Sequence, residues 1–353
     1  MLLRFGGPAP VIVVTVLFAL GGARSSYLAQ REVIHASEER QLTRVATVLR
    51  SVIDAEARRT TALAEVFAAR ESVKSEIRAG GREAVLAETT PVYDTLKGGY
   101  GIEGMQFDQL PGSVFLRMHE PEKFGDDVTG RQMVMLAMTG GEAQGGVEVG
   151  KSGAKVRGVV QLKDGAGALG AVEIMAGFDP VLATTKAMTG FEVAAYLKQV
   201  GEPPAGARML DGYRELATTD RETILSVFDA DSLDGITETM VGRETVGETR
   251  YGVMRTPLLD FGGNNIGVIV ATRSFADLQS DENAVFRNAL VAAIVQIVAV
   301  SGVVLLVFNG LLLRPLRRLT AAAEAGEGPD EATLARKDEV GALARALAKG
   351  KAS

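Results

Sequence analysis

Charged side chains of both signs gather around residues 113–121, which read SVFLRMHEP. Arg117 and His119 lie two positions apart in this stretch, and alternate residues of a β-strand point to the same face. If that face is the concave side of a sheet, the two side chains form a cationic spot that suits a carboxylate. The alternative is that one of them pairs with Asp126 or Asp127 and so fixes the loop that follows the strand.

A candidate ligand-binding site follows from this cluster and from charged residues further along the chain. It consists of Arg117, His119, Asp126, Asp127, Arg131, Glu148 and Arg157. The site favours a small-molecule ligand, with an anionic one as the first choice. Glu148, Arg157 and the nearby Glu173 could instead be exposed strand residues. A metal site on the imidazole with either aspartate is the weaker hypothesis, so we predict no metal and no cofactor.

No motif in the chain indicates an enzyme. The glycine pairs at 145–146 and 262–263 do not open a helix in the pattern of a phosphate-binding loop, so they are predicted to be turns. The 353 residues include no cysteine, which excludes disulfides and thiolate nucleophiles. A net charge of −6 provides no basic footprint for nucleic acid. We therefore expect neither catalysis nor a nucleic-acid partner.

Two uncharged apolar runs predict membrane spans. Residues 289–308 contain no charged side chain, and about 20 such residues in a helix cross the hydrocarbon core of a bilayer. Arg314, Arg317 and Arg318 follow, which places that end in the cytoplasm. The predicted order is a cytoplasmic N-terminus at 1–8, a span at 9–27 and a second span at 288–312. If the first run were instead a cleaved signal peptide, the protein would be secreted.

The region between the spans would lie outside the inner (plasma) membrane, in the periplasm of a Gram-negative cell. Residues 28–99 are predicted to form long helices, with a break near Thr60-Thr61, a stop at Gly80-Gly81 and a kink or split at Pro91. Two strands, a helix and three strands follow, with Asp164-Gly165 as a hairpin turn. This is an α+β fold of the PAS-like kind, with an antiparallel sheet of about five strands and helices beside it.

Two such modules are predicted. The membrane-distal module is placed at 100–188 and contains a helix over 129–138. A second, smaller set of strands at 189–280, one of them at 236–246, predicts a membrane-proximal module of the same class.

Residues 313–353 predict two short helices joined by a connector. Leu316 and Leu319 mark an apolar seam on the first helix, and Leu343 and Leu347 mark one on the second. Neither helix can bury its seam alone, so we expect a homodimer in which the helices form a parallel four-helix bundle.

Both parts resemble known families. The segment after the second span resembles the HAMP linker of bacterial receptors on Arg314-Pro315-Leu316, Ala325-Gly326, Asp338-Glu339-Val340-Gly341, Leu343 and Ala344. The outside region resembles the double Cache sensor domains of chemotaxis receptors on residues 113–121, 123–127, 146–150 and 157–160. Relatives are expected to carry a Phe-His pair where this chain has Phe107-Asp108, which indicates a different ligand if that His contacts it.

The resemblance implies a transmembrane receptor that binds a small extracytoplasmic ligand and transmits the signal through HAMP, as chemotaxis receptors do. The sequence shows no long signalling helix, kinase or cyclase after Gly341. The expectation is therefore either a truncated chain or a separate cytoplasmic signalling protein as a partner. A membrane-anchored solute-binding protein or co-receptor without signalling of its own is the alternative.

Overall fold

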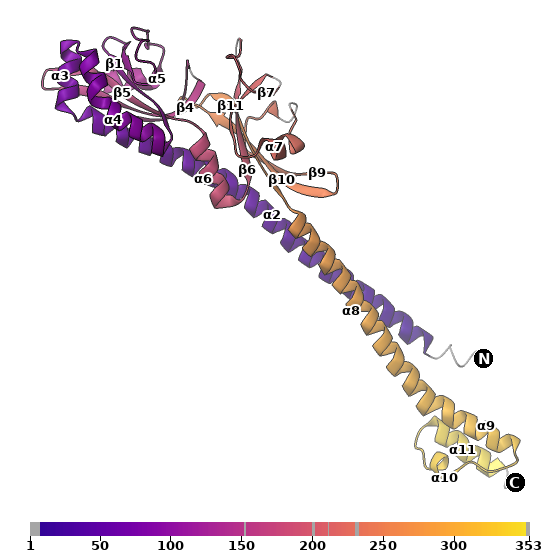
Figure 1. Ribbon diagram of the computed structural model, residues 1–353. Helices are drawn as coiled ribbons and strands as arrows, with labels where there is room; N and C mark the ends of the chain where they lie inside the picture. Colours follow the sequence, from indigo (N-terminus) through magenta and orange to yellow (C-terminus); the bar gives the residue numbers. More distant parts are fainter. Residues whose placement is uncertain (1–7, 152, 200–201, 211, 230–232, 351–353) are drawn as a thin grey trace. The chain divides into compact units, whose positions relative to one another are not determined.

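The computed structural model describes residues 8–151, 153–199, 202–210, 212–229 and 233–350. The chain divides into two compact units. The helical unit comprises Met1–His35 and Leu278–Ser353, and the sheet unit comprises Ala36–Asp277 (Figure 1). The fold is α+β, with one long N-terminal helix and two antiparallel sheets, as predicted.

Three helices precede the first sheet: α2 (Ala9–Ala68), α3 (Glu71–Ala79) and α4 (Arg82–Tyr100). The predicted break at Thr60-Thr61 is wrong. The Thr60 hydroxyl donates to the backbone oxygen of Ala57 at 2.9 Å, so its polar group is satisfied within the helix. The helix ends instead before Arg70. Gly80 stops α3 as predicted, in a left-handed conformation that leaves its N–H free to bond the carbonyl of Glu76.

Of the two predicted effects of Pro91, a kink or a split, the split does not occur, because α4 continues through this residue. Its interior is held on one side by packing, since Val85, Tyr93 and Leu96 are buried in the core beneath the first sheet. Tertiary burial therefore outweighs the loss of one helical hydrogen bond at the proline.

The first sheet has the order β2-β1-β5-β4-β3, and every neighbouring pair is antiparallel. Its strands are β1 (Ile102–Gln109), β2 (Ser113–Arg117), β3 (Gln144–Gly150), β4 (Gly153–Asp164) and β5 (Gly167–Ala176). The predicted hairpin turn at Asp164-Gly165 joins β4 to β5. Helix α5 (Gln132–Gly140) begins three residues later than predicted, because the chain at Arg131 is still extended.

The two faces of this sheet differ in chemistry. Met105, Phe107 and Ile174 point to an apolar core shared with α3 and α4. The alternate residues of the same strands, among them Gln106 and Glu173, face the side on which α5 packs. The polar face is thus on the α5 side of the sheet.

Helix α6 (Asp179–Thr189) leads into a second sheet with the order β7-β8-β6-β11-β10-β9. Its strands are β6 (Glu192–Lys198), β7 (Met209–Leu210), β8 (Tyr213–Thr218), β9 (Met240–Val246), β10 (Thr249–Leu259) and β11 (Asn265–Ser274), and α7 (Arg221–Val227) follows β8. With six strands, this sheet is not the smaller one that the sequence predicts. The strand expected from residue 236 begins only at Met240.

Both sheets rest on α2. Gly158 of β4 lies so close to the backbone of Thr60 and Thr61 that no side chain fits between them. Nearer the N-terminus of α2, the buried carboxylate of Glu38 lies 2.6 Å from Nε of Arg243 in β9 and 2.9 Å from Nη2 of Arg250 in β10. The same helix therefore carries both modules.

Among the described residues, two helices are long and apolar enough to cross a membrane, Ala9–Ala68 and Ala276–Glu324. The second consists of α8 (Ala276–Phe308), a π-helical turn (Asn309–Leu313) and α9 (Arg314–Glu324). The predicted spans at 9–27 and 288–312 lie within these helices. Helices α10 (Glu331–Leu334) and α11 (Glu339–Gly350) follow.

Candidate ligand-binding site

A cavity of about 690 Å³ opens on the α5 side of the first sheet. The residues that line it come from β1, β2, β4, β5, the loop after β2 and the turn after β3: Gln106, Arg117, His119, Glu120, Glu122, Lys123, Phe124, Asp126, Asp127, Val128, Arg131, Lys151, Arg157 and Met175. Of these, Phe124, Val128 and Met175 are the apolar members. The wall is therefore polar, and charges of both signs contribute to it.

Six of the seven predicted site residues line this cavity: Arg117, His119, Asp126, Asp127, Arg131 and Arg157. Glu148 lies behind the wall. One of its carboxylate oxygens accepts from Nε of Arg131 at 2.8 Å, and the other accepts from the backbone N–H of Met133 at 2.9 Å. Glu148 thus holds Arg131 and the first turn of α5, a positioning role.

Arg117 fixes the loop that covers the cavity. Its Nε donates to Oε1 of Gln106 and its Nη1 to the backbone oxygen of Lys123, both at 3.0 Å. Its Nη2 lies 2.6 Å from Oδ2 of Asp126. This is the pairing alternative considered above for Arg117. Lys151 also contacts the Asp126 carboxylate, at 2.9 Å, and these two cations hold its pKa below the usual range, Lys151 having the larger effect.

Glu173 is the centre of a buried arginine cluster at the back of the cavity. Its Oε1 lies 2.8 Å from Nη2 of Arg131 and also contacts Nη1 of Arg157, whose side chain is only 2% exposed. Burial alone would raise the pKa of Glu173, but the charges of Arg157 and Arg131 outweigh it and keep the pKa low. Arg157 and Glu173 are therefore not the exposed strand residues of the alternative interpretation.

Gln106 connects this wall to a second buried carboxyl group. Its amide Nε2 donates to Oδ1 of Asp108 at 2.7 Å, while its Oε1 accepts from Arg117. Asp108 is fully buried, and its burial, reinforced by the charge of Glu173, raises its pKa to about 8. Asp108 is thus protonated and uncharged at pH 7, although it stands next to an arginine-rich wall.

His119 and Asp127 contribute little positive or metal-binding character. Burial lowers the pKa of His119, so its imidazole is neutral at pH 7, and its Nδ1 has no hydrogen-bond partner among the described residues. Asp127 accepts a 2.9 Å hydrogen bond from the N–H of Thr129 and so shapes the turn before α5. No group of three or more metal-ligating side chains occurs in the described part of the chain.

Sequence reasoning missed several wall residues, among them Gln106, Lys151 and Met175. In the sheet register, Gln106 of β1 lies opposite Arg117 of β2 on one side and Glu173 of β5 on the other. It therefore links residues that are far apart in the sequence. Gln106 and Asp108 are two polar residues on one face of a mostly buried strand, and this pattern is the signal that could have identified Gln106.

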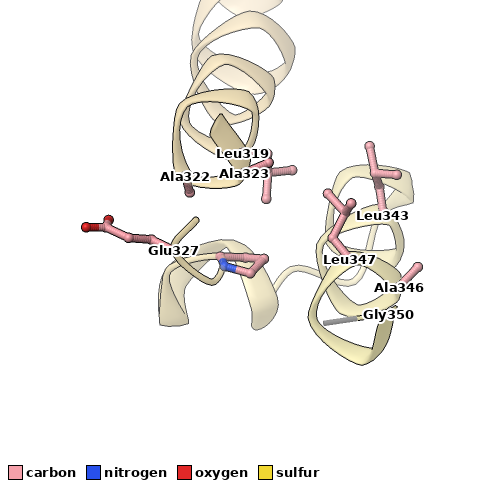
Figure 2. Close-up of a pocket in the computed structure, with 9 residues that line it drawn as sticks. Leu319, Ala322, Ala323, Glu327, Leu343, Ala346, Leu347 and Gly350 are labelled. Carbon is pink, nitrogen blue, oxygen red and sulfur yellow. The ribbon is translucent and has the colours of Figure 1, made fainter. Parts of the chain in front are cut away.

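The helical unit has a candidate site of its own, a groove between α9 and α11. Leu319, Val340 and Ala344 form a small core between these helices. Next to this core, a groove of about 480 Å³ is lined by Leu319, Ala322, Ala323, Glu327, Pro329, Leu343, Ala346, Leu347 and Gly350 (Figure 2). Leu343 and Leu347 are 47% and 43% exposed, so an apolar strip of α11 is left uncovered.

The predicted motif at 338–341 shapes the start of α11. Asp338 accepts a 3.1 Å hydrogen bond from the N–H of Gly341, and it also pairs with Arg336, which together lower its pKa to about 2, the arginine having the larger effect. A Cβ at Gly341 would overlap the backbone oxygen of Arg336. The connector therefore requires both the aspartate and the glycine.

Two consecutive sheets, with a polar cavity in the first and apolar helices before and after them, define a double Cache sensory domain. The family model described as the double sensory domain of two-component sensor kinases matches residues 35–278, and the chain belongs to this family. Domains of this kind are the ligand-binding parts of chemoreceptors and sensor kinases, so the role of this protein is that of a sensory receptor.

Solved structures of sensor domains are similar to the chain at low identity. A domain of a sensory box/GGDEF family protein from Vibrio parahaemolyticus is 10% identical, with a TM-score of 0.43, covering 70% of this chain and 99% of the other. The periplasmic domain of Vibrio cholerae LuxQ is 9% identical, with a TM-score of 0.42, covering 66% and 99%. The ligand-binding domain of the Campylobacter jejuni chemoreceptor Tlp3, in complex with L-valine, is 11% identical, with a TM-score of 0.42, covering 73% and 97%. A search of curated proteins found no match.

Proposed function

We propose that the protein is a membrane-anchored receptor that binds a small carboxylate-bearing molecule in the cavity of the first sheet and transmits binding through α8 to the helices that follow. The observation that carries the proposal is the buried arginine cluster. Arg117, Arg131 and Arg157 converge on one cavity from three different elements, and each is held in place by hydrogen bonds or ion pairs. Cations fixed in this way are preorganised for an oxyanion.

The charge balance of the cavity narrows the ligand class. Asp126, Glu148 and Glu173 offset the three arginines, while Asp108 is protonated at pH 7. A ligand that carries both a carboxylate and a cationic or hydrogen-bond-donating group matches such a wall better than a polyanion does, because buried charges of either sign need partners. An amino acid or a hydroxy acid fits this description and the cavity volume.

A thermal-shift screen of the full-length protein in lipid nanodiscs tests the ligand class. We expect amino acids or hydroxy acids to raise the unfolding temperature, and simple amines to have no effect. Arg117→Ala should abolish the shift while the protein still folds cooperatively. Arg208→Ala removes an exposed arginine just before β7 and serves as the matched control. A ligand response that survives in Arg117→Ala removes Arg117 from the site.

The placement of the domains is part of the same proposal. Residues 9–27 and 288–312 serve as spans, 28–287 lie in the periplasm, with one module at 100–188 and the other at 189–280, and 313–353 form a cytoplasmic HAMP linker. Because the chain has no native cysteine, single cysteines report topology directly. A membrane-impermeant maleimide should label Lys163→Cys in intact spheroplasts but label Lys349→Cys only after permeabilisation. Equal labelling of the two positions contradicts this topology.

The apolar strip on α11 supports a homodimer that signals through these helices. In a parallel four-helix bundle, the same strip from two chains meets at the axis. Leu347→Cys should therefore form a disulfide-linked dimer in membranes, whereas Lys349→Cys, two residues away on the helix, should cross-link much less. Cross-linking of the position-347 variant should change when ligand is added if α8 transmits binding. A yield that ligand leaves constant favours the alternative, a membrane-anchored solute-binding protein without signalling of its own.

A further inference from the structure

A second cavity, of about 430 Å³, lies between the two sheets and is distinct from the first. We call it the inter-sheet cavity. Its walls are the turn after β3, the end of β6 with the residues that follow, β8 and the start of β11: Val149, Gly150, Lys151, Gly153, Leu197, Lys198, Gln199, Glu202, Pro204, Arg214, Asn265 and Ile266. Lys151, Lys198 and Arg214 supply three positive charges, and Glu202 supplies one negative charge.

Arg214 is the unusual residue of this wall. Its Nε is fully buried and has no hydrogen-bond partner, and no ion pair of its guanidinium occurs among the described residues. The neighbouring Glu215 does not provide one, because its carboxylate lies 3.3 Å from Arg208 and 3.0 Å from Arg221. By contrast, the arginines of the first cavity, Arg117, Arg131 and Arg157, each have a carboxylate partner. Arg214 is therefore a half-buried cation with open donor positions.

The backbone at Gly153 leaves space for the Arg214 guanidinium. Gly153 adopts a positive φ of 102°, and a Cβ there would overlap Nη2 of Arg214. The turn after β3 thus leaves room for the guanidinium to lie against its backbone, yet none of the described residues of this turn accepts a hydrogen bond from it. A buried donor without an acceptor is costly, and the cost disappears when an anion fills the position.

We propose that the inter-sheet cavity binds a small oxyanion, a carboxylate or phosphate group, through Arg214, with Lys198 and Lys151 at its rim. The planar guanidinium presents two N–H groups in the geometry that such an anion accepts. Lys151 lines both cavities and contacts Asp126 in the first. An anion between the sheets therefore competes with Asp126 for Lys151, which couples the second site to the loop over the first.

Thermal unfolding of the full-length protein in nanodiscs, with succinate and inorganic phosphate as separate probes, tests this proposal. Tyrosine emission can follow unfolding because the chain has no Trp and Tyr213 adjoins Arg214. We expect at least one probe to raise the midpoint in the wild-type protein, because a ligand that binds the folded state stabilises it. Arg214→Met should weaken that probe at least about tenfold, and Arg208→Met, the exposed control, should not.

Two further results separate this site from the first cavity and from a purely structural role. Without any probe, Arg214→Met should unfold at the wild-type temperature or above it, because no partner is lost; a structural ion pair would give the opposite result. The response to the probe should persist in Arg117→Ala. If Arg117→Ala abolishes the response to the probe and Arg214→Met leaves it intact, the probe binds in the first cavity and the proposal is wrong. The proposal is also wrong if the wild-type protein responds to neither probe.

Discussion

Nη2 of Arg117 lies 2.6 Å from Oδ2 of Asp126, and this ion pair joins the end of β2 to the loop that covers the candidate ligand cavity. The loop runs over the open side of the sheet, and the Arg117 guanidinium also binds its backbone at Lys123. The same side chain therefore faces the ligand and holds the loop in place. Ligand binding and loop order should be coupled through it.

Asp126→Asn should loosen this loop. The amide cannot form the ion pairs with Arg117 and Lys151, so the backbone amides of residues 119–127 should exchange with deuterium several-fold faster. Glu122→Gln makes the same charge change in the same loop, at a residue with no ion pair among the described residues, and should leave exchange unchanged. Hydrogen exchange followed by mass spectrometry measures both. Equal protection in the two variants would show that the ion pair does not order the loop.

Asp108→Asn should stabilise the protein at alkaline pH. The pKa of Asp108 is about 8 in the folded protein, above an ordinary value of 3.8, because it is buried and faces Glu173, with Gln106, Arg131 and Arg117 opposing the shift. Between these values the folded chain holds one proton more than the unfolded chain, so the free energy of unfolding falls as pH rises. Shifts of this size are worth on the order of several kcal/mol.

The measurement is the unfolding temperature between pH 6 and pH 9. Wild-type protein should lose stability over this range, while Asp108→Asn, which keeps an acceptor for Gln106, should lose less and should unfold about 5 °C or more above wild type at pH 9. Asp94→Asn, at an exposed position of α4, is the control and should follow the wild-type curve. Parallel curves for wild type and Asp108→Asn would mean that Asp108 is already ionised in the folded state.

Local signals in the sequence predicted most of the fold. The turn at Asp164-Gly165, the helix stop at Gly80 and the alternation of apolar residues depend on neighbours within a few positions, and each appears where it was expected. The wrong predictions concern features that tertiary contacts decide. Pro91 does not split α4, because the helix is packed against the core of the first sheet.

The sequence predicted most of the charged residues that line the site, but it did not predict which of them form ion pairs and hydrogen bonds with one another. The charged residues around Arg117 identified the cavity, because several ionisable groups on few elements imply a shared polar space. Their pairing depends on strand register over long separations: Gln106 lies opposite both Arg117 and Glu173, which come from strands on either side of β1. No local pattern encodes that register, so the neutral state of Asp108 and the role of Glu148 as a support emerged only from the structure.

Gly158→Ala should destabilise the first module. The added Cβ would overlap the backbone of Thr60 and Thr61, and neither the helix nor β4, which is paired on both sides, can move away without disturbing its neighbours. Overpacking of this kind costs about 2–3 kcal/mol or more. Gly165→Ala, in the hairpin turn where nothing lies within 4 Å of the new Cβ, should change stability by less than about 0.5 kcal/mol. Chemical denaturation of the two variants compares them, and similar midpoints would contradict the close packing of α2 on β4.

Glu38→Ala should detach the second sheet from α2. The Glu38 carboxylate is fully buried between Arg243 and Arg250 of the β9–β10 hairpin, and removing one member of a buried ionic group typically costs about 3–5 kcal/mol. Glu39→Ala removes the adjacent exposed carboxylate and should have almost no effect. Hydrogen exchange should show lost protection confined to β9, β10 and the facing turns of α2, because the first sheet has its own core. If protection instead falls equally in both sheets, the two modules unfold as one cooperative unit, and the Glu38 ion pairs do not stabilise the second sheet alone.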